Sequence, residues 1–307
     1  MTSLINRARA LAVFASAVIA AAASVAPAAA FDIEASAYFG NLGLPWDGET
    51  AMTDAEFPAD GWLYGGRAAF VQRLGDGFSL VAEYETDPVL RNIVRGVITY
   101  KTGMASISAG PMVGVFNSAG HALKAGIDIG FRLEAPGIAF FSADVESSMG
   151  AGLVTAGDYS QEASELSAGW YVYNAICSAS LISKRFTRII DAGALVDAST
   201  DYLFSVDVHK KGTPYRVLTE LGYRTMTRTY PDDTIDGLGA VILGAEVNAD
   251  VSPTLTVVAG LDSGVYVFGL EELSGRGPAS SSFLFSASVG FVLHLGDKPT
   301  AEPPALE

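Results

Sequence analysis

The chain has 307 residues, a formal net charge of −15, a single cysteine and 50% hydrophobic residues. The negative charge excludes a nucleic-acid-binding protein, because phosphate recognition needs a basic face. Cys177 as the only cysteine excludes an intramolecular disulfide, and the 10% of aromatic residues argue against a disordered chain.

Residues 1–30 have the pattern of a cleaved secretory signal peptide. Two arginines precede an uncharged apolar run from Leu11 to Ala23, and three alanines ending at Ala30 offer small residues to a signal peptidase. We therefore expect an exported mature chain that begins at Phe31, with no lipid attachment because no cysteine lies nearby. A retained membrane helix is the alternative, and the short apolar run argues against it.

The mature chain alternates apolar and polar residues over many segments, which is the pattern of β-strands with two different faces. The first segment runs from Phe31 to Phe39, and the second from Trp62 to Arg73. The clearest runs from Leu123 to Glu134, where apolar residues alternate with glycines and charged residues. Charged side chains need water while the apolar face needs lipid, so this combination is typical of a transmembrane β-barrel.

Three parts of the chain qualify this pattern. Pro111 lies within a segment of strand character, and we expect a bulge or a local defect in the hydrogen-bond ladder there. Two strands are predicted between Glu165 and Asp191, where the alternation is weakest. The last strand, Phe283–Leu295, has one wholly apolar face and exceeds the roughly 9–11 residues that cross a membrane at a tilt.

The count is about 14 strands, with about 12 as the alternative, in an even number as single-chain bacterial barrels require. We predict an all-β fold, a single antiparallel up-and-down barrel over residues 31–295. Connections after the even strands are short and most others are long, which predicts that both chain termini lie on the periplasmic side. The proline-containing residues 296–307 are predicted to form a disordered periplasmic tail.

The polar face of these strands carries charged residues of both signs, which we predict to line the lumen. They are Arg67, Glu83, Glu85, Arg91, Arg95, Lys124, Asp128, Arg132, Asp144, Glu146, Arg216, Glu220, Arg224 and Glu246, and Arg185 and Arg228 are assigned to the same face. Such charges either pair across a plugged interior or line a hydrated channel with a transverse field. A barrel of about 14 strands is wider than the eight-stranded type that side chains can fill, which favours the channel.

No catalytic or metal-binding constellation is predicted, and we expect neither an enzyme nor a cofactor. The three histidines, His121, His209 and His294, are assigned to different rims of the barrel. The sequence Asp262-Ser263-Gly264 matches half of an aspartic-protease site but has no second copy, so we interpret it as a strand end. The acids between Asn41 and Gly61 are interpreted as a solvated loop rather than a divalent-cation site.

On this alternation, which extends from Phe31 to Leu295, the chain resembles the small monomeric porins of Gram-negative outer membranes. The resemblance implies a passive channel for small hydrophilic solutes. It also implies contact with outer-membrane lipid and a lipopolysaccharide-type surface, insertion by the barrel-assembly machinery, and a monomer. The alternatives are a structural or adhesive barrel with a plugged lumen, whose outer loops mediate interaction, an outer-membrane enzyme, and a soluble periplasmic β-sandwich.

Overall fold

The structure, a computed structural model, describes residues 30–42, 63–75, 77–118, 121–148, 156–210, 212–268 and 284–296. Its elements are β1 (Phe31–Gly40), β2 (Leu63–Gly75), β3 (Phe78–Asp87), β4 (Arg91–Thr102), β5 (Ala105–Ser118), β6 (His121–Ala135), β7 (Ala139–Ser147), β8 (Tyr159–Val172), β9 (Ala175–Ile190), β10 (Gly193–His209), β11 (Tyr215–Thr229), β12 (Ile235–Ser252), β13 (Leu255–Phe268) and β14 (Leu284–Leu295). No helix in these ranges is long and apolar enough to cross a membrane.

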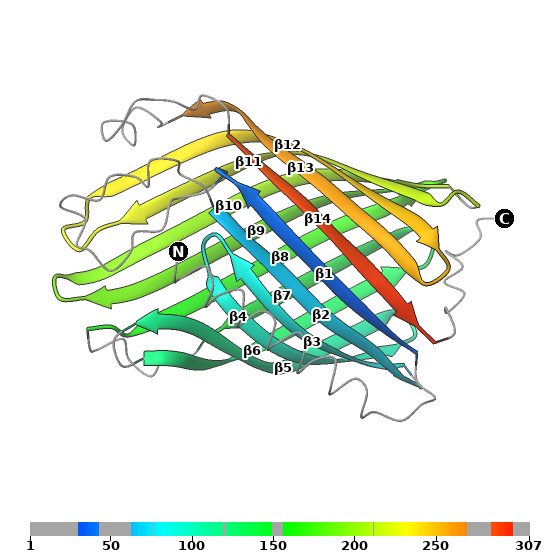
Figure 1. Ribbon diagram of the computed structural model, residues 1–307, viewed down its shortest axis with the longest axis horizontal. Helices are drawn as coiled ribbons and strands as arrows, with labels where there is room; N and C mark the ends of the chain where they lie inside the picture. Colours follow the sequence, from blue (N-terminus) through cyan, green and yellow to red (C-terminus); the bar gives the residue numbers. More distant parts are fainter. Residues whose placement is uncertain are drawn as a thin grey trace.

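The strands form one closed antiparallel barrel in which each strand pairs with its neighbours in the sequence (Figure 1). β1 and β14 close the ring, with Phe31 opposite Leu295 and Gly40 opposite Ser286. The prediction of an all-β up-and-down barrel with 14 strands is confirmed, and the alternative of 12 is wrong. Closure leaves no unpaired sheet edge, so the backbone groups can be satisfied in a membrane.

The two ends of the barrel differ in their connections. We call the end where β1 begins and β14 ends the terminal end, and the opposite end the loop end. Short turns join the strands at the terminal end, and the first of them uses positive φ at Gly75 and Gly77, a conformation that glycine adopts without strain. The longest connections lie at the loop end, and their residues 43–62, 149–155 and 269–283 are outside the described ranges.

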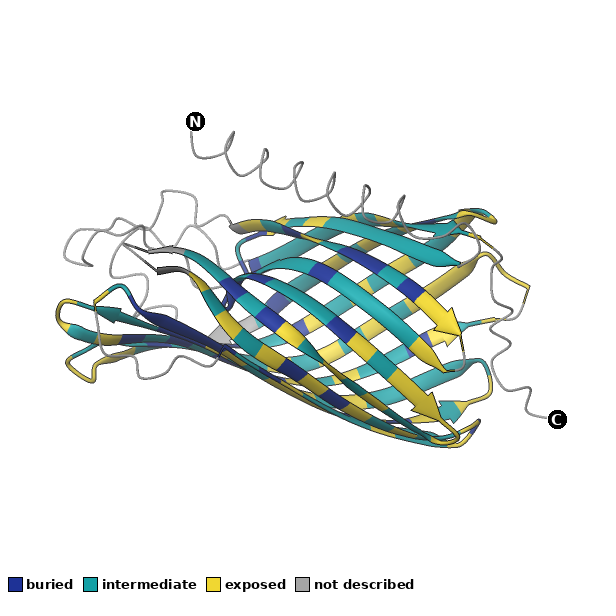
Figure 2. Cartoon of the chain, turned by 90° about the horizontal axis from the view of Figure 1, so that it is seen from below, coloured by how far each residue is buried: buried dark blue, intermediate teal, exposed yellow. Residues whose placement is uncertain are grey.

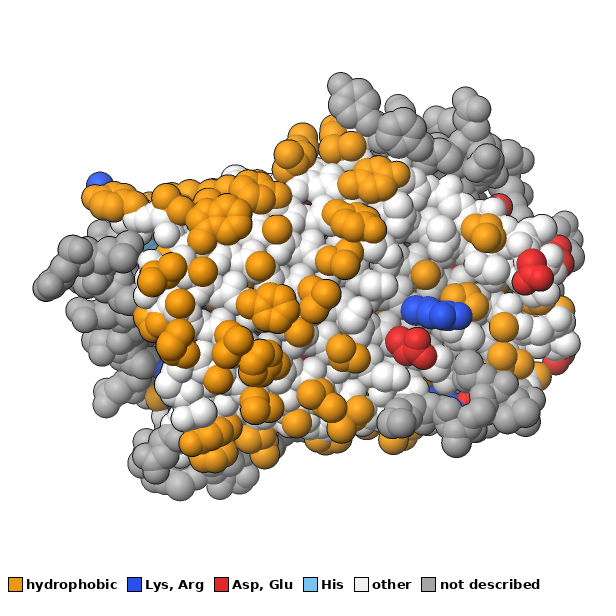
Figure 3. Space-filling model, turned by 180° about the vertical axis from the view of Figure 1, so that it is seen from behind, with side chains coloured by type: hydrophobic (Ala, Val, Ile, Leu, Met, Phe, Trp, Pro, Cys, Tyr) orange, Lys and Arg blue, Asp and Glu red, His pale blue; other side chains and the backbone are white. Residues whose placement is uncertain are grey.

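The outward face is apolar, as a lipid-facing surface requires. Figure 3 shows hydrophobic side chains over the wall, with acidic and basic side chains gathered toward the loop end. Exposed and less exposed residues alternate along the strands (Figure 2). The most exposed apolar residues on the clearest predicted strand are Leu123, Ile127, Ile129, Phe131 and Leu133, all of one parity. The alternation read from the sequence therefore separates the lipid face from the interior.

Pro111 produces the local defect that the sequence predicts. The pairing of β4 with β5 runs from Asn92 to Arg95 and resumes at Ile98 in the same register. Gly96 and Val97 are not paired in that ladder, because a proline has no N–H to donate. The β5 strand keeps its pairing with β6 through Pro111, so the defect is a missing rung rather than a bulge.

Three local assignments from the sequence are wrong. Arg185 points outward with Leu181, whereas Phe186 and Lys184 point inward, so the two faces of β9 were exchanged. Tyr159 and Gln161 were assigned to a loop but begin β8. Asp262 was taken as a strand end but lies within β13, opposite Gly244 and Ser286. In each case serine and small residues weakened the hydrophobic contrast between the faces.

The segments 1–29 and 297–307, which contain nearly all of the predicted signal peptide and of the predicted tail, lie outside the described residues. Both described ends of the barrel chain, Phe31 and Leu295, meet at the terminal end. The periplasmic location of that end, the cleavage near Ala30 and the disorder of the tail therefore stay predictions.

Candidate functional site in the barrel interior

The β3–β4 turn crosses the interior near the loop end. Arg91 of β4 binds Asp197 of β10, with an Nη2–Oδ2 distance of 2.5 Å, and Lys184 of β9 pairs with Asp87 of β3. Five strands separate the partners of each pair on the shorter way round the ring. These contacts can exist only if the turn reaches from one wall across the lumen to the other.

The turn is built by its own first residue. The Asp87 carboxylate accepts hydrogen bonds from the backbone N–H groups of Val89 and Leu90, at 2.7 and 2.8 Å, in the manner of an Asx turn. The side-chain amide of Gln161, on β8, donates to the carbonyl oxygens of Leu90 and Asn92. The turn is therefore fixed both by its own Asp87 carboxylate and by the Gln161 side chain of β8.

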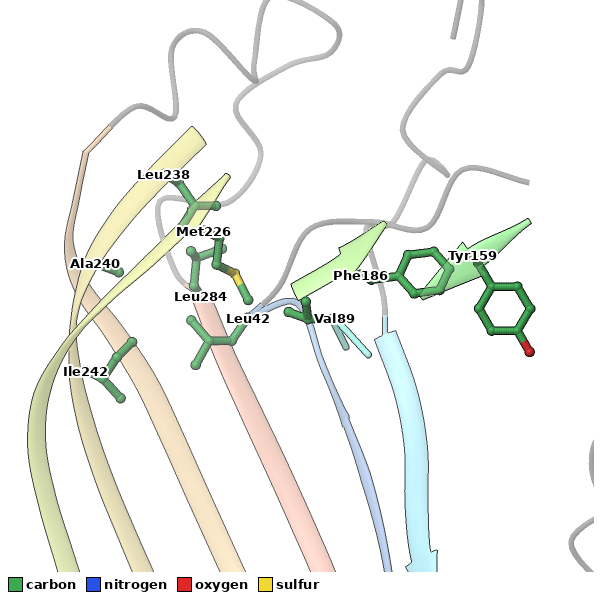
Figure 4. Close-up of a cluster of buried hydrophobic side chains, with 9 residues drawn as sticks. All are labelled: Leu42, Val89, Tyr159, Phe186, Met226, Leu238, Ala240, Ile242 and Leu284. Carbon is green, nitrogen blue, oxygen red and sulfur yellow. The ribbon is translucent and has the colours of Figure 1, made fainter. Parts of the chain in front are cut away.

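An apolar cluster packs around this turn inside the barrel (Figure 4). Val89 and Leu42 lie between Met226, Leu238, Ala240, Ile242 and Leu284 on one side and Phe186 and Tyr159 on the other. The rings of Phe186 and Tyr159 approach Phe116 with centroid distances of 5.1 and 5.5 Å. This buried apolar cluster occupies part of the barrel interior at the level of the β3–β4 turn.

Charged inward side chains differ widely in solvent exposure. Near the terminal end the inward side chains of Lys101 and Arg216 are 60% and 58% exposed. Near the loop end the side chains of Arg91 and Asp197 are only 6% and 4% exposed. The charged side chains at the terminal rim are therefore exposed, whereas those that anchor the β3–β4 turn are buried.

Two arginines of the predicted set join carboxylates of neighbouring and more distant strands. Arg67 binds Glu34 at 2.8 Å and Glu83 at 2.9 Å. Arg95 pairs with Glu85, lies 3.7 Å from Glu83, and lies 3.5 Å from Glu146, which is three strands away on β7. These ion pairs hold β3, β4 and β7 at a fixed separation across the interior.

The other basic residues of the predicted set have separate partners. Arg224 binds Asp201 through two hydrogen bonds of 2.8 and 2.7 Å. Arg216 Nε donates to both carboxylate oxygens of Asp207. Lys124 pairs with Asp158. Arg132 lies 3.8 Å from Glu134 and stacks over Phe140 at 4.0 Å. Each basic member of the set therefore has an acidic partner on an inward face.

Several acids of the set lie next to other acids. Asp128 on β6 stands directly opposite Glu146 on β7, and Asp144 stands opposite Glu165 on β8. On the wall formed by β11, β12 and β13, the Asp262 and Glu220 carboxylates converge over Gly244 of β12. Any side chain in place of that glycine would meet both of them. Glu246 accepts a 2.8 Å hydrogen bond from the Asn248 amide. The interior is thus richer in acids than in bases in its middle part.

Several charged residues of this interior were not predicted from the sequence. Asp197, Asp201 and Asp207 lie on the inward parity of β10, and the alternation with Tyr202 and Phe204 could have found them. Its first half, rich in Ala, Ser and Thr, concealed how far β10 extends. Lys184 was hidden by the exchanged faces of β9. Asp87 was seen only as a turn residue, because no sequence pattern shows a turn folding inward.

His294 makes a contact that was not expected. Its Nδ1 lies 2.7 Å from Asp32 Oδ1 on β1, and its Nε2 lies 3.2 Å from the Thr256 hydroxyl on β13. Thr256 in turn donates to Asp250 at 2.5 Å. This chain of hydrogen bonds crosses the seam between the first and last strands at the terminal end. Among the described residues, no group of three His, Cys, Asp or Glu could hold a metal ion.

The closed ring, its apolar outward face and its charged interior decide the fold class. The chain is a closed up-and-down β-barrel of 14 strands with the apolar outward face of a transmembrane barrel. No family model matches this barrel, and no curated protein matches it either. One similar solved structure is a porin at 12% identity, with 86% of this chain and 100% of that chain covered and a TM-score of 0.43. Another is a monoaromatic hydrocarbon channel at 9% identity, with 88% of this chain and 89% of that chain covered and a TM-score of 0.49.

An anion-selective porin from Comamonas acidovorans is also similar to this chain, at 12% identity, with 87% of this chain and 98% of that chain covered and a TM-score of 0.39. At these identities the likeness concerns the fold alone. The chemistry of the interior has to be argued from this chain's own residues.

Proposed function

We propose that the barrel is a passive channel for small hydrophilic solutes, lined by the charged residues predicted from the sequence. The observation that carries this proposal is the exposure of inward charged side chains within the strands, 44% for Arg67 on β2 and 39% for Arg132 on β6. Charged groups that stay in contact with water inside a barrel line a hydrated lumen. A ring of this strand number is too wide for side chains alone to fill.

In this proposal the β3–β4 turn sets the size limit. The ion pairs Lys184–Asp87 and Arg91–Asp197 tie the turn to the opposite wall. A solute entering from the hydrated end meets these pairs and the apolar cluster before it reaches the loop end. The turn is anchored by few side chains, so weakening them is expected to widen the passage.

Liposome swelling with a graded series of sugars tests the size limit. The double variant Asp87→Asn, Lys184→Gln removes the ion pair and keeps a side-chain oxygen for the turn's backbone N–H groups. We expect this variant to admit larger sugars than the wild-type protein. The matched control is Asp207→Asn, Arg216→Gln, which removes an ion pair between neighbouring strands and should leave the limit unchanged. An equal limit in all three proteins would contradict the role given to the turn.

A structural or adhesive barrel with a plugged lumen is the second candidate, and the buried cluster around Val89 favours it. In that case the loop-end segments would mediate contacts with surfaces or other molecules. Neither the wild-type protein nor the Asp87→Asn, Lys184→Gln variant would then admit any sugar. Deleting the loops and finding surface binding unchanged would count against this candidate.

The cellular setting belongs to the same proposal. We infer export with cleavage near Ala30, insertion by the barrel-assembly machinery, a monomeric state, and contact of the outward apolar face with outer-membrane lipid and a lipopolysaccharide-type surface. We also infer that the terminal end faces the periplasm. Mass measurement of the purified protein should give a mature chain starting at Phe31. A tag cut from intact cells by external protease at residue 307 would contradict the orientation.

A further inference from the structure

The inner wall formed by β6, β7 and β8 carries acids in directly opposed positions. Asp128 faces Glu146 across the β6–β7 pair, and Asp144 faces Glu165 across the β7–β8 pair, one inward position nearer the terminal end. Like charges placed directly opposite in a sheet destabilise it. A wall with two such pairs in succession needs a function or a counter-charge to account for it.

The first of these pairs is buried and poorly compensated. Asp128 and Glu146 are 4% and 6% exposed. Within the described part of the chain no ion pair or hydrogen bond involves the Asp128 side chain, and Glu146 Oε2 has no hydrogen-bond partner and only a 3.5 Å ion pair with Arg95. A buried carboxylate without a partner is costly, so this position favours a ligand that supplies positive charge and hydrogen-bond donors.

Among the described residues, the one cation that makes an ion pair with Glu146 is shared. Arg95 reaches Glu146 at 3.5 Å but also pairs with Glu85 and lies 3.7 Å from Glu83. Its Nε is itself buried without a hydrogen-bond partner. One guanidinium therefore faces three carboxylates that it touches and a fourth, Asp128, within range of its charge. The wall keeps an excess of negative charge after Arg95 is counted.

The acids form a path from the hydrated part of the lumen to the buried pair. Glu165 is exposed, Asp144 is half-buried, and Asp128 and Glu146 are buried. The Asp144 carboxylate lies over Gly130, whose missing side chain leaves room at this place on the wall. A small cation can therefore meet carboxylates of increasing burial as it moves away from the terminal end.

The kind of cation follows from the donors present. The described acids include no group of three that could hold a metal ion. The wall already accepts a guanidinium, because Arg95 lies between carboxylates of β3 and β7. Guanidinium and primary ammonium groups carry several N–H donors that match carboxylate oxygens without a fixed coordination geometry.

We propose that Asp128, Glu146 and Asp144 form a binding site in the lumen for small organic cations that carry a guanidinium or primary ammonium group. This inference rests on the proposed channel and names a class of solute for it. The site makes the lumen prefer cations over anions. Asp128 is the residue that the site depends on most, because it has no cation of its own.

Binding is tested by isothermal titration calorimetry on the folded, detergent-solubilised protein with agmatine, which carries both groups. The double variant Asp128→Asn, Glu146→Gln should bind agmatine at least about tenfold more weakly, from the loss of two charges next to the ligand. The control Asp207→Asn removes an acid that has its own arginine and should bind as the wild type does. Propylurea, a neutral probe, should not bind.

A purely structural role is separated by stability. If the site serves a ligand, Asp128→Asn removes a repulsion and should unfold at a temperature equal to or above that of the wild type. A midpoint several degrees lower would overturn the proposal, as would agmatine binding that the double variant leaves intact. Tighter binding of calcium chloride than of agmatine would also overturn it.

Conduction is measured separately, so that the two proposals can fail independently. In a potassium chloride gradient the wild-type channel should prefer potassium to chloride. Asp128→Asn and Glu146→Gln should each lower the potassium-to-chloride permeability ratio roughly threefold. A preference that both variants leave unchanged would overturn the site while leaving the channel in place. Absence of current with intact agmatine binding would overturn the channel and leave the site.

Discussion

Arg95 illustrates how much of the interior depends on single side chains. Its guanidinium contacts or approaches Glu83, Glu85 and Glu146, which come from two different walls. Its side chain is 18% exposed, so water compensates only a part of what these contacts supply. The residue therefore acts both as a counter-charge and as a brace between β4 and β7.

The substitution Arg95→Gln is expected to lower the free energy of unfolding by about 3 kcal/mol, because it leaves the buried Glu146 carboxylate without its cation. Urea unfolding of the reconstituted protein, followed by tryptophan fluorescence, measures the change. The control Arg132→Gln removes a more exposed arginine and should cost no more than about 1 kcal/mol. Equal effects of the two substitutions would contradict this account of Arg95.

His294 is a second residue whose contacts join distant parts of the chain. It links Asp32 on β1 to Thr256 on β13 across the closing strand. Substitution by alanine removes both hydrogen bonds and should lower stability by about 1–2 kcal/mol. The midpoint of the heat-induced band shift on a denaturing gel should fall accordingly. Ser288→Ala, on the same face of β14, is the control. An equal fall in the midpoints of both variants would argue against a stabilising role of the His294 hydrogen bonds.

The β3–β4 turn, residues 87–91, is the element that most shapes the interior. Phe186 packs beside it, with the Arg91 guanidinium 5.2 Å from its ring centroid. Phe186→Ala should destabilise the barrel by about 3 kcal/mol and raise single-channel conductance, because it opens the packing around the turn. Phe204→Ala, on the outward face, should leave conductance unchanged. A conductance that rises with Phe204→Ala but not with Phe186→Ala would contradict this reading.

At the scale of elements, local alternation was enough for most of the fold. Strands such as β6, with charged residues between large apolar ones, were predictable because one face needs lipid and the other needs water. β9 was not, because Ser178, Ser180 and Ser183 blur the contrast between its faces. The inward course of the β3–β4 turn depends on partners about a hundred residues away, Lys184 and Asp197, which no local pattern can identify.

The interior site was predictable in part for the same reason. The fourteen charged residues proposed from the sequence include those whose ion pairs hold the walls together, such as Arg67 and Arg224. Which acids remain without a cation could not be read from the sequence, because pairing depends on the register between strands. Asp128 and Glu146 become neighbours only through the β6–β7 register.

At the scale of the whole molecule, the barrel has two different halves. Exposed charged groups such as Lys101 and Arg216 lie at the terminal rim, and the loop half contains a turn, an apolar cluster and buried ion pairs. A membrane-facing apolar surface surrounds both. Such an arrangement suits a channel with one wide entrance and one narrow level that selects solutes.

The most direct test of this account is the single-channel conductance of purified, heat-modifiable protein in planar bilayers. We predict discrete current steps in potassium chloride for the wild-type protein, and larger steps for the Asp87→Asn, Lys184→Gln variant in which the turn is released. Folded protein of both kinds that inserts into the bilayer and never gives a step would contradict a conducting lumen and leave the plugged barrel as the better description.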